Sequence, residues 1–392
     1  MRRAVIIDIV RSPFGRGRPD GVLGAIHPVD LYAQVLQALI ARTGADPALI
    51  EDVITGCVIQ AGEQAGNIGR QAVLAAGFPE HVPAVTLDRK CGSAQQAIDF
   101  AAQGIIAGAY DLVVAGGVEM MGLVPMRSNR MGKDSEGPRF RARYPGGHVH
   151  QGLAAEKVAV RWGIGRGEQD AFALRSHRLA AAAEDAGLTA RSIAPIGVGE
   201  RLVERDEGLR RDTSLERLAG LRPAYRNPAA EAAHPELGWT VTAGNASQVS
   251  DGAVAILIAE EGFATRLGLT PRAAITRFAV CGDDPAMVLT AIMPATRKLL
   301  ARAGLEIGDI DAFEVNEAFA SVVLAWQKEF EVNPERVNRY GGAIALGHPV
   351  GASGGRLMAA LVTALEQSRG RYGLQLMCES GGMANATLIE RG

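Results

Sequence analysis

The fold of this 392-residue chain is constrained most strongly by two stretches in which strand-like and helix-like segments alternate. Residues of different character separate the two stretches. In residues 1–118, apolar β-rich runs at 53–59 and 82–88 alternate with helical periodicity at 31–42 and 93–107. The alternation resumes at about residue 270. Because such alternation is typical of helices layered on a sheet, the sequence predicts an α/β fold.

The second stretch resembles the first in its local pattern. It predicts helices at 291–303, 317–330 and 353–366, and closing strands at 374–378 and 386–389. In each stretch, a loop of small residues opens a helix and a strand follows, which indicates a duplicated fold. Residues 119–248 lose the pattern and are predicted to form an inserted lobe, after which the strand 254–258 returns to the first domain. The expected domains are 1–118 with 249–270, 119–248, and 271–392.

Charge and cysteine usage exclude several function classes. A net charge of −2 predicts no general attraction to nucleic acid or to an anionic membrane. The four cysteines form no CxxC pair, so neither a disulfide framework nor a metal cluster is expected. The first apolar run is short and interrupted by Asp8, and no run of eighteen apolar residues follows. We therefore expect a cytoplasmic protein with free thiols.

Cys91 lies at a predicted strand–helix junction in the segment 88–97, DRKCGSAQQA. The free N–H groups at a helix N-terminus favour negative charge, so the pKa of this thiol is expected to fall and its nucleophilicity to rise. Taken by itself, the segment fits a buried structural cysteine at least as well.

His348 lies in the glycine-rich segment 341–354, GGAIALGHPVGASG, which would hold a general base rigidly. A packing loop with a buried histidine is the alternative. The overlapping GASGG at 351–355 fits a hydrolase nucleophile elbow, but neither Asp nor His follows Ser353, so that triad order is excluded. Ala94 and Gln95 break a papain-type pattern, and no GxGxxG follows a strand.

Two further segments carry candidate polar groups. Asn316, in VNEAFA at 315–320, either caps a helix or orients a water or a histidine. Cys378 ends a predicted strand and leads into the glycine turn of MCESGGM at 377–383. The backbone N–H groups of such a turn can form an oxyanion hole, although a simple β-turn between antiparallel strands is the alternative.

Together, these four segments in this order resemble the thiolase family along essentially the whole chain. Supporting segments are RSPFG at 11–15, GGVEMM at 116–121, EQD at 168–170 and TAGNAS at 242–247. The resemblance implies a duplicated five-layer αβαβα fold with an inserted loop domain, and a homodimer or homotetramer. It also implies coenzyme A as co-substrate, with no permanently bound cofactor. The forms of the two cysteine segments look most like bacterial degradative thiolases.

The resemblance also implies residue roles. Cys91 attacks the ketone of a 3-ketoacyl-CoA, His348 accepts its proton, and Cys378 acts as the second acid and base. Asn316 would hold a water with His348 in one oxyanion hole, and the backbone N–H groups of Cys91 and Ser380 would form the other. The implied coenzyme A and acyl contacts are Ser247, Ala243, Arg210, Tyr225, His150, Ala318 and Phe319.

Several positions depart from the family pattern. Ser380 replaces a glycine, and a positive φ there would strain the serine by about 1 kcal/mol or more. Gln151 argues against an enzyme restricted to acetoacetyl-CoA. The basic stretch 127–143 is expected to meet the CoA 3′-phosphate, to join subunits, or to be a solvated loop.

Three alternatives to a degradative enzyme are a biosynthetic thiolase that forms acetoacetyl-CoA, a condensing enzyme of the ketoacyl-synthase type and a non-catalytic acyl-CoA or lipid carrier. Cys378 argues against the condensing enzyme, and a carrier has no need of both sulfurs and His348.

Overall fold

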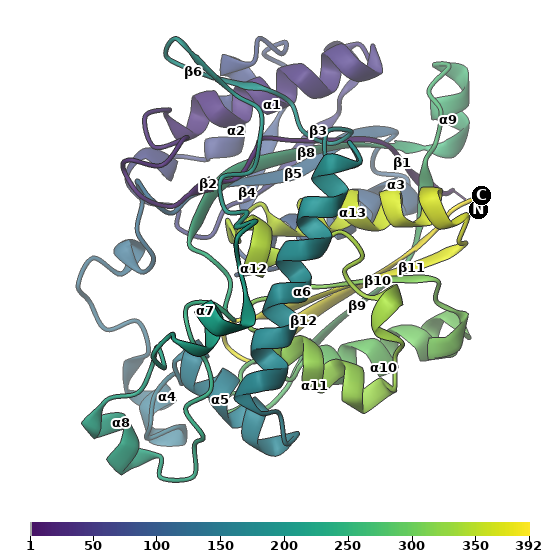
Figure 1. Ribbon diagram of the computed structural model, residues 1–392. Coiled ribbons are helices and arrows are strands. Elements are labelled where there is room, and N and C mark those ends of the chain that lie inside the picture. Colours follow the sequence, from purple (N-terminus) through teal and green to yellow (C-terminus); the bar gives the residue numbers. More distant parts are fainter. Residues whose placement is uncertain (1) are drawn as a thin grey trace.

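The computed structural model describes residues 2–392, which stack in five alternating layers of helix and sheet (Figure 1). Helices cover the two outer faces, and two buried helices separate the sheet strands of the N-terminal half from those of the C-terminal half. The helices are α1 (Pro28–Thr43) and α2 (Ile68–Ala75) on one outside, α3 (Ser93–Ala107) and α13 (Ser353–Ser368) in the centre, and α10 (Ile292–Ala303) and α11 (Ala320–Phe330) on the other.

The strands of the two halves repeat one pattern. In the first half the order is β4 (Ala84–Leu87), β3 (Asp52–Gly56), β5 (Leu112–Met120), β8 (Ser250–Glu260) and β1 (Ala4–Arg11). In the second it is β10 (Ala312–Val315), β11 (Tyr372–Glu379), β12 (Met383–Glu390) and β9 (Ala273–Gly282). Parallel pairing at the outer edge, with two pairs in the first half and one in the second, gives way in each half to two antiparallel pairs. The repeated pattern agrees with the predicted duplication.

A short antiparallel pairing joins the two halves. Residues Ala4, Val5 and Ile6 of β1 pair with Ile275, Ala274 and Ala273 of β9. The strands therefore run as one continuous sheet that bends around the central helices, so that α3 and α13 pack against strands from both halves.

The central helices approach each other closely because small residues lie between them. Ala94, Ala97 and Ala101 of α3 are fully buried, and a Cβ added to Gly354 of α13 would lie 2.4 Å from the backbone nitrogen of Gln95. Only glycine fits at that crossing. This close approach places the loops before the two helices, with Cys91 and His348, side by side.

In the segment between β5 and β8, the helices α4, α5, α7 and α8 form a lobe at the lower left of Figure 1, α6 runs through the centre and β6 lies at the top. The long helix α6 packs against α11 and α12. The helices of this segment are α4 (Gly137–Arg143), α5 (Gln151–Arg161), α6 (Arg166–Asp185), α7 (Leu215–Ala219) and α8 (Pro228–Ala233); its strands are β6 (Ile196–Val198) and β7 (Arg201–Val203). The remaining elements are β2 (Gly15–Arg16), α9 (Glu261–Arg266) and α12 (Ala343–Leu346).

Two predicted boundaries were wrong because buried carboxylates take the backbone donors. The strand predicted to reach residue 59 ends at Gly56, since the Glu119 carboxylate accepts from the N–H groups of Val58 and Ile59 at 2.8 and 3.1 Å. The helix predicted from residue 317 begins at Ala320, since Glu317 is buried and accepts from Ile344 N–H at 3.2 Å.

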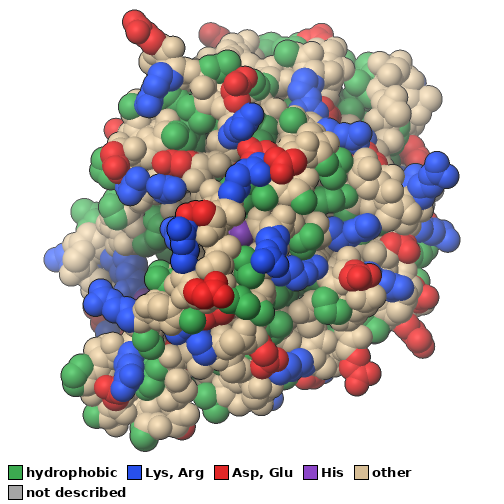
Figure 2. All heavy atoms as spheres, in the orientation of Figure 1, with side chains coloured by type: hydrophobic (Ala, Val, Ile, Leu, Met, Phe, Trp, Pro, Cys, Tyr) green, Lys and Arg blue, Asp and Glu red, His purple; other side chains and the backbone are tan. Residues whose placement is uncertain are grey.

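The surface carries charges of both signs. In Figure 2, basic and acidic side chains are interspersed over the visible face, in keeping with the small net charge. Among residues 2–392, no helix combines the length and the apolar character needed to cross a membrane.

We expect the stability of the fold to fall as pH rises from 5 to 8, in part because of Asp99. Burial raises the pKa of this α3 carboxyl to about 7, against about 3.9 in an unfolded chain. The folded state therefore holds the proton more tightly than the unfolded chain. The resulting contribution to the free energy of unfolding is fully present below pH ~4 and is lost as pH rises through ~7. Asp99→Asn should flatten the dependence by roughly 2–3 kcal/mol between pH 5 and 8.

Urea unfolding at several pH values measures this slope. Asp20→Asn, at an exposed carboxyl paired with Arg18, is the control and should keep the wild-type slope. Parallel curves for Asp99→Asn and wild type would contradict the assignment.

Candidate active site

A braced turn between β4 and α3 presents Cys91. Lys90 adopts the left-handed conformation with φ 52°, which costs a non-glycine residue about 1 kcal/mol. Asp88 Oδ1 accepts from Lys90 N–H at 2.7 Å, and Ser93 Oγ donates to the Lys90 carbonyl at 2.7 Å. These contacts hold the strained residue in place and fix the direction of the neighbouring Cys91 side chain.

Cys91 lies in an apolar enclosure with backbone donors at the sulfur. Its side chain packs in a cluster with Val58, Met121, Val350, Leu357 and Met377 and is only 5% exposed. The N–H groups of Ser380 and of Cys91 itself point at Sγ. This is the pair of backbone donors expected to form an oxyanion hole.

The expectation of a lowered Cys91 pKa was wrong. Burial raises the pKa of this thiol to about 12, and the neighbouring Glu379 carboxyl raises it further, while the two N–H groups oppose the shift. Desolvation in the apolar enclosure therefore outweighs the helix N-terminus. Cys91 is a thiol at neutral pH and needs a base to become a nucleophile.

His348 is the candidate for that base. Burial, with the nearby Arg356 charge, lowers the pKa of His348 to about 3, so the imidazole is neutral. Ser353 Oγ donates to the Pro349 carbonyl at 2.8 Å and lies 2.6 Å from His348 Nδ1, from which it must therefore accept. The proton then resides on Nδ1, and Nε2 carries the lone pair that can accept a proton.

Asn316 connects His348 with Cys378. Its Nδ2 lies 3.4 Å from His348 Nε2, and its side chain donates to Cys378. Asn316 caps no helix, because the cap position of α11 is Phe319. Cys378 is buried at the end of β11, and burial together with the Cys91 sulfur raises its pKa. Two sulfurs, one imidazole and one side-chain amide from four distant segments thus share one buried site.

Ser380 carries no strain. It is absent from the residues with positive φ among positions 2–392, and the left-handed conformations of the β11–β12 turn fall on Gly381 (φ 89°) and Gly382 (φ 75°). The serine therefore replaces a glycine without a conformational penalty, and the strain that a positive φ would have caused does not arise.

Ser353 is a site residue that the sequence alone did not reveal. We expect Ser353→Ala to lower kcat about 10- to 100-fold with little change in KM, because His348 loses the acceptor that fixes its tautomer. Ser353→Thr should restore most of the rate. Thr363→Ala removes a similar hydroxyl from the same helix and should leave kcat unchanged. An unaltered kcat in Ser353→Ala would show that the contact has no role.

The expected coenzyme A contacts fall into two groups and one isolated residue. Ser247 N–H donates to the Ala318 carbonyl at 2.9 Å, and Ala246 bridges to Phe319, which places the 243–247 loop against residues 318 and 319. Ala243 is exposed on this loop.

The second group is aromatic. Tyr225 lies with its ring centroid 5.2 Å from that of His150 and 6.3 Å from that of Phe319. Arg210 is exposed, and its N–H donates to His177. In the described chain, no hydrogen bond joins Arg210 to either group.

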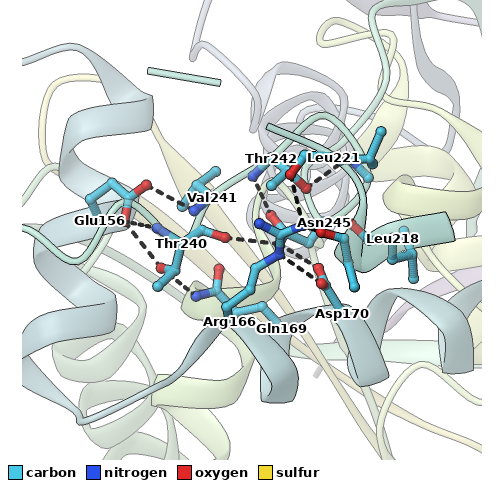
Figure 3. A network of polar contacts seen from close by, with 12 residues as sticks. Glu156, Arg166, Gln169, Asp170, Leu218, Leu221, Thr240, Val241, Thr242 and Asn245 are labelled. Carbon is cyan, nitrogen blue, oxygen red and sulfur yellow. Dashed lines mark hydrogen bonds and ion pairs between the residues drawn. The ribbon is translucent and has the colours of Figure 1, made fainter. Parts of the chain in front are cut away.

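A buried polar network holds the loop that carries Ala243 and Ser247 (Figure 3). The Glu156 carboxylate of α5 accepts from Thr240 and Val241 N–H, each at 2.8 Å. Asp170 of α6 accepts from Asn245 Nδ2 at 2.9 Å and pairs with Arg166 at 2.6 Å. The EQD and TAGNAS segments singled out in the sequence are thus bonded to each other through Asp170 and Asn245. Glu156 joins the residues just before that loop to α5.

The basic stretch 127–143 is exposed and includes η3 (Ser128–Arg130) and α4. Arg141 pairs with Asp134 at 3.2 Å, so part of its charge is neutralised locally. In Figure 2, a hollow at the left, above the lobe of α4 and α8, has basic side chains at its edge.

Comparisons with known proteins agree with this geometry. A family model described as "Thiolase, N-terminal domain" matches residues 4–262, and one described as "Thiolase, C-terminal domain" matches 269–391. The chain is 45% identical to the steroid 3-ketoacyl-CoA thiolase FadA6 of Mycobacterium tuberculosis, over 100% of this chain and 95% of the relative. It is 43% identical to a 3-ketoacyl-CoA thiolase of Shewanella denitrificans, over the full length of both.

The fold has a close match among solved structures. The crystal structure of the Bacillus anthracis acetyl-CoA acetyltransferase superposes with a TM-score of 0.89 at 37% identity, covering 100% of this chain and 99% of that one.

Proposed function

This chain belongs to the thiolase family, and we propose that it is a 3-ketoacyl-CoA thiolase. It cleaves a 3-ketoacyl-CoA with coenzyme A to give acetyl-CoA and a shortened acyl-CoA, and the reaction is reversible. The observation that carries the proposal is the shared site of Cys91, Cys378 and a neutral His348, linked through Asn316.

In the first half-reaction, His348 Nε2 takes the thiol proton of Cys91, and Sγ bonds to the ketone carbon of the substrate. The bond between C2 and C3 then breaks, and its electron pair remains on C2 of the departing acetyl-CoA. Cys378 protonates that carbon. The products are acetyl-CoA, an acyl thioester on Cys91, a Cys378 thiolate and a His348 imidazolium.

In the second half-reaction, the Cys378 thiolate takes the proton of the coenzyme A thiol, and the new thiolate attacks the acyl carbonyl. The Cys91 and Ser380 N–H groups that point at Sγ support an oxyanion on that carbonyl. Cys91 leaves as a thiolate and recovers its proton from His348. All three groups return to their starting protonation states.

The decisive experiment mixes the enzyme, a 3-ketoacyl-CoA and coenzyme A, and follows the enolate absorbance of the substrate. We expect a loss of absorbance that depends on coenzyme A, with substrates tested from acetoacetyl-CoA to sterol-sized acyl-CoAs. If no chain length is cleaved while coenzyme A still binds, the carrier alternative replaces this proposal.

We further propose a degradative role, supported by Gln151 at the start of α5 and by the names of the relatives. The substrate series tests it: cleavage of acetoacetyl-CoA alone would favour the biosynthetic alternative. The four free cysteines, three of them buried, support a reducing, cytoplasmic location.

We propose that the enzyme is a homo-oligomer that uses the open edge of β4. This strand ends the sheet, and its Val85 is 44% exposed. An unpaired edge with an apolar side chain favours pairing with a second chain. Light scattering should give at least a dimer, and Val85→Lys should weaken the assembly. A monomeric wild type would contradict the proposal.

A further inference from the structure

Glu379 is a buried acid between the two sulfur-bearing segments that the mechanism above does not use. It follows Cys378 on β11, so its side chain points to the opposite face of the strand, toward the start of α3. There it touches Gly92: a Cβ added to that glycine would lie 1.9 Å from Glu379 Oε1. Glu379 is thus adjacent in sequence to one catalytic sulfur residue and packed against the residue that follows the other.

The Glu379 carboxyl has no partner. It is 0% exposed, and neither oxygen accepts a hydrogen bond from any group in residues 2–392. A carboxylate left this way is costly, whereas a neutral acid is much less so. Burial raises the pKa of Glu379 to about 9. The charged or titratable groups that face it are Arg89 and Asp88 from the loop before α3, Asp99 from α3, and the sulfurs of Cys91 and Cys378.

We propose that Glu379 is a positioning residue that controls the charge of both sulfurs: as a neutral acid it permits a thiolate at Cys91 or Cys378, and as a carboxylate it opposes both. The reaction proposed above forms a thiolate at each sulfur in turn inside an apolar enclosure. A second buried negative charge beside them would raise the free energy of each thiolate.

The consequence is a loss of activity on the alkaline side. At neutral pH Glu379 keeps its proton, and turnover is unaffected. As pH rises through about 9, the carboxyl ionises and thiolate formation becomes harder. This inference rests on the roles proposed for the two sulfurs, but it can be tested without measuring catalytic turnover.

The test is the rate at which iodoacetamide alkylates Cys91 between pH 6.5 and 10.5 in wild type and in Glu379→Gln. Mass spectrometry of peptides locates the alkylated residue. We expect equal rates near pH 7 and about tenfold faster alkylation of the Gln variant at pH 10. Superimposable rate profiles across the range would overturn the proposal.

Two controls keep the result specific. Glu390→Gln changes a half-buried acid at the far end of β12, paired with Arg371, and should follow wild type. Glu379→Leu is also neutral, so its alkylation profile should match that of Glu379→Gln. It is the variant to measure if Glu379→Gln disturbs folding. A rate change of equal size at every pH in both Glu379 variants would indicate a purely structural residue and would also overturn the proposal.

The outcome separates this inference from the proposed function. If wild type cleaves no 3-ketoacyl-CoA but the alkylation profiles diverge, the function fails and the control of charge stands. If cleavage occurs and the profiles coincide, only the role of Glu379 fails.

Discussion

Cys91→Ala is expected to lower kcat/KM at least 10⁴-fold, because the acyl thioester forms on this sulfur and the other sulfur of the site, Cys378, serves as the general acid and base. The sulfur is enclosed by apolar side chains, and two N–H groups point at it. Substrate and coenzyme A should still bind within about threefold of wild type, since the loop that carries Ser247 is held by Glu156 and Asp170, away from the sulfur.

Mass spectrometry of enzyme incubated with a 3-ketoacyl-CoA supplies a second readout. Wild type should gain the mass of one acyl group on the peptide that contains Cys91, and the variant should gain none. Cys281→Ala, on β9, is the matched control and should retain full activity. Activity that survives in Cys91→Ala would place the nucleophile elsewhere.

The sequence predicted the elements that depend on local pattern. The helix expected at 93–107 is α3 with identical bounds, because its run of alanines and its terminal Gly108 (φ 85°) define both periodicity and end. The sequence also indicated a glycine turn between antiparallel strands directly after Cys378. Gly381 and Gly382 supply the positive φ of that turn.

The sequence could not predict what depends on distant partners. β3 ends at Gly56 because Glu119, sixty residues later in the chain, accepts the hydrogen bond of Ile59 N–H. Ser353 has a role in the site because it contacts the His348 imidazole. The Cys91 pKa was misjudged for the same reason: a helix N-terminus is visible in the sequence, but the surrounding Val58, Val350 and Met377 are not. The domain limits at 118, 248 and 270 stay predictions.

Cys378→Ser is expected to lower kcat about 10³-fold, within the range for loss of a general acid and base. Serine keeps the size of the side chain, but its hydroxyl is a much weaker acid than a thiol and does not protonate the acetyl-CoA carbanion. Its alkoxide, which would have to act as the base, does not form readily at neutral pH. Asn316 donates to Cys378 in the folded site, so the replacement oxygen should still be held in place. The defect should therefore be in proton transfer and not in binding.

Exchange of deuterium into the methyl group of acetyl-CoA in D₂O measures that proton transfer directly. Wild type should catalyse the exchange, and Cys378→Ser should lose it, because the carbon acid is deprotonated only by the thiolate at this position. Iodoacetamide should still alkylate Cys91 in the variant at the wild-type rate near pH 7, which shows that the nucleophile is intact. Exchange at the wild-type rate would mean that another group, with His348 the nearest base linked through Asn316, moves this proton.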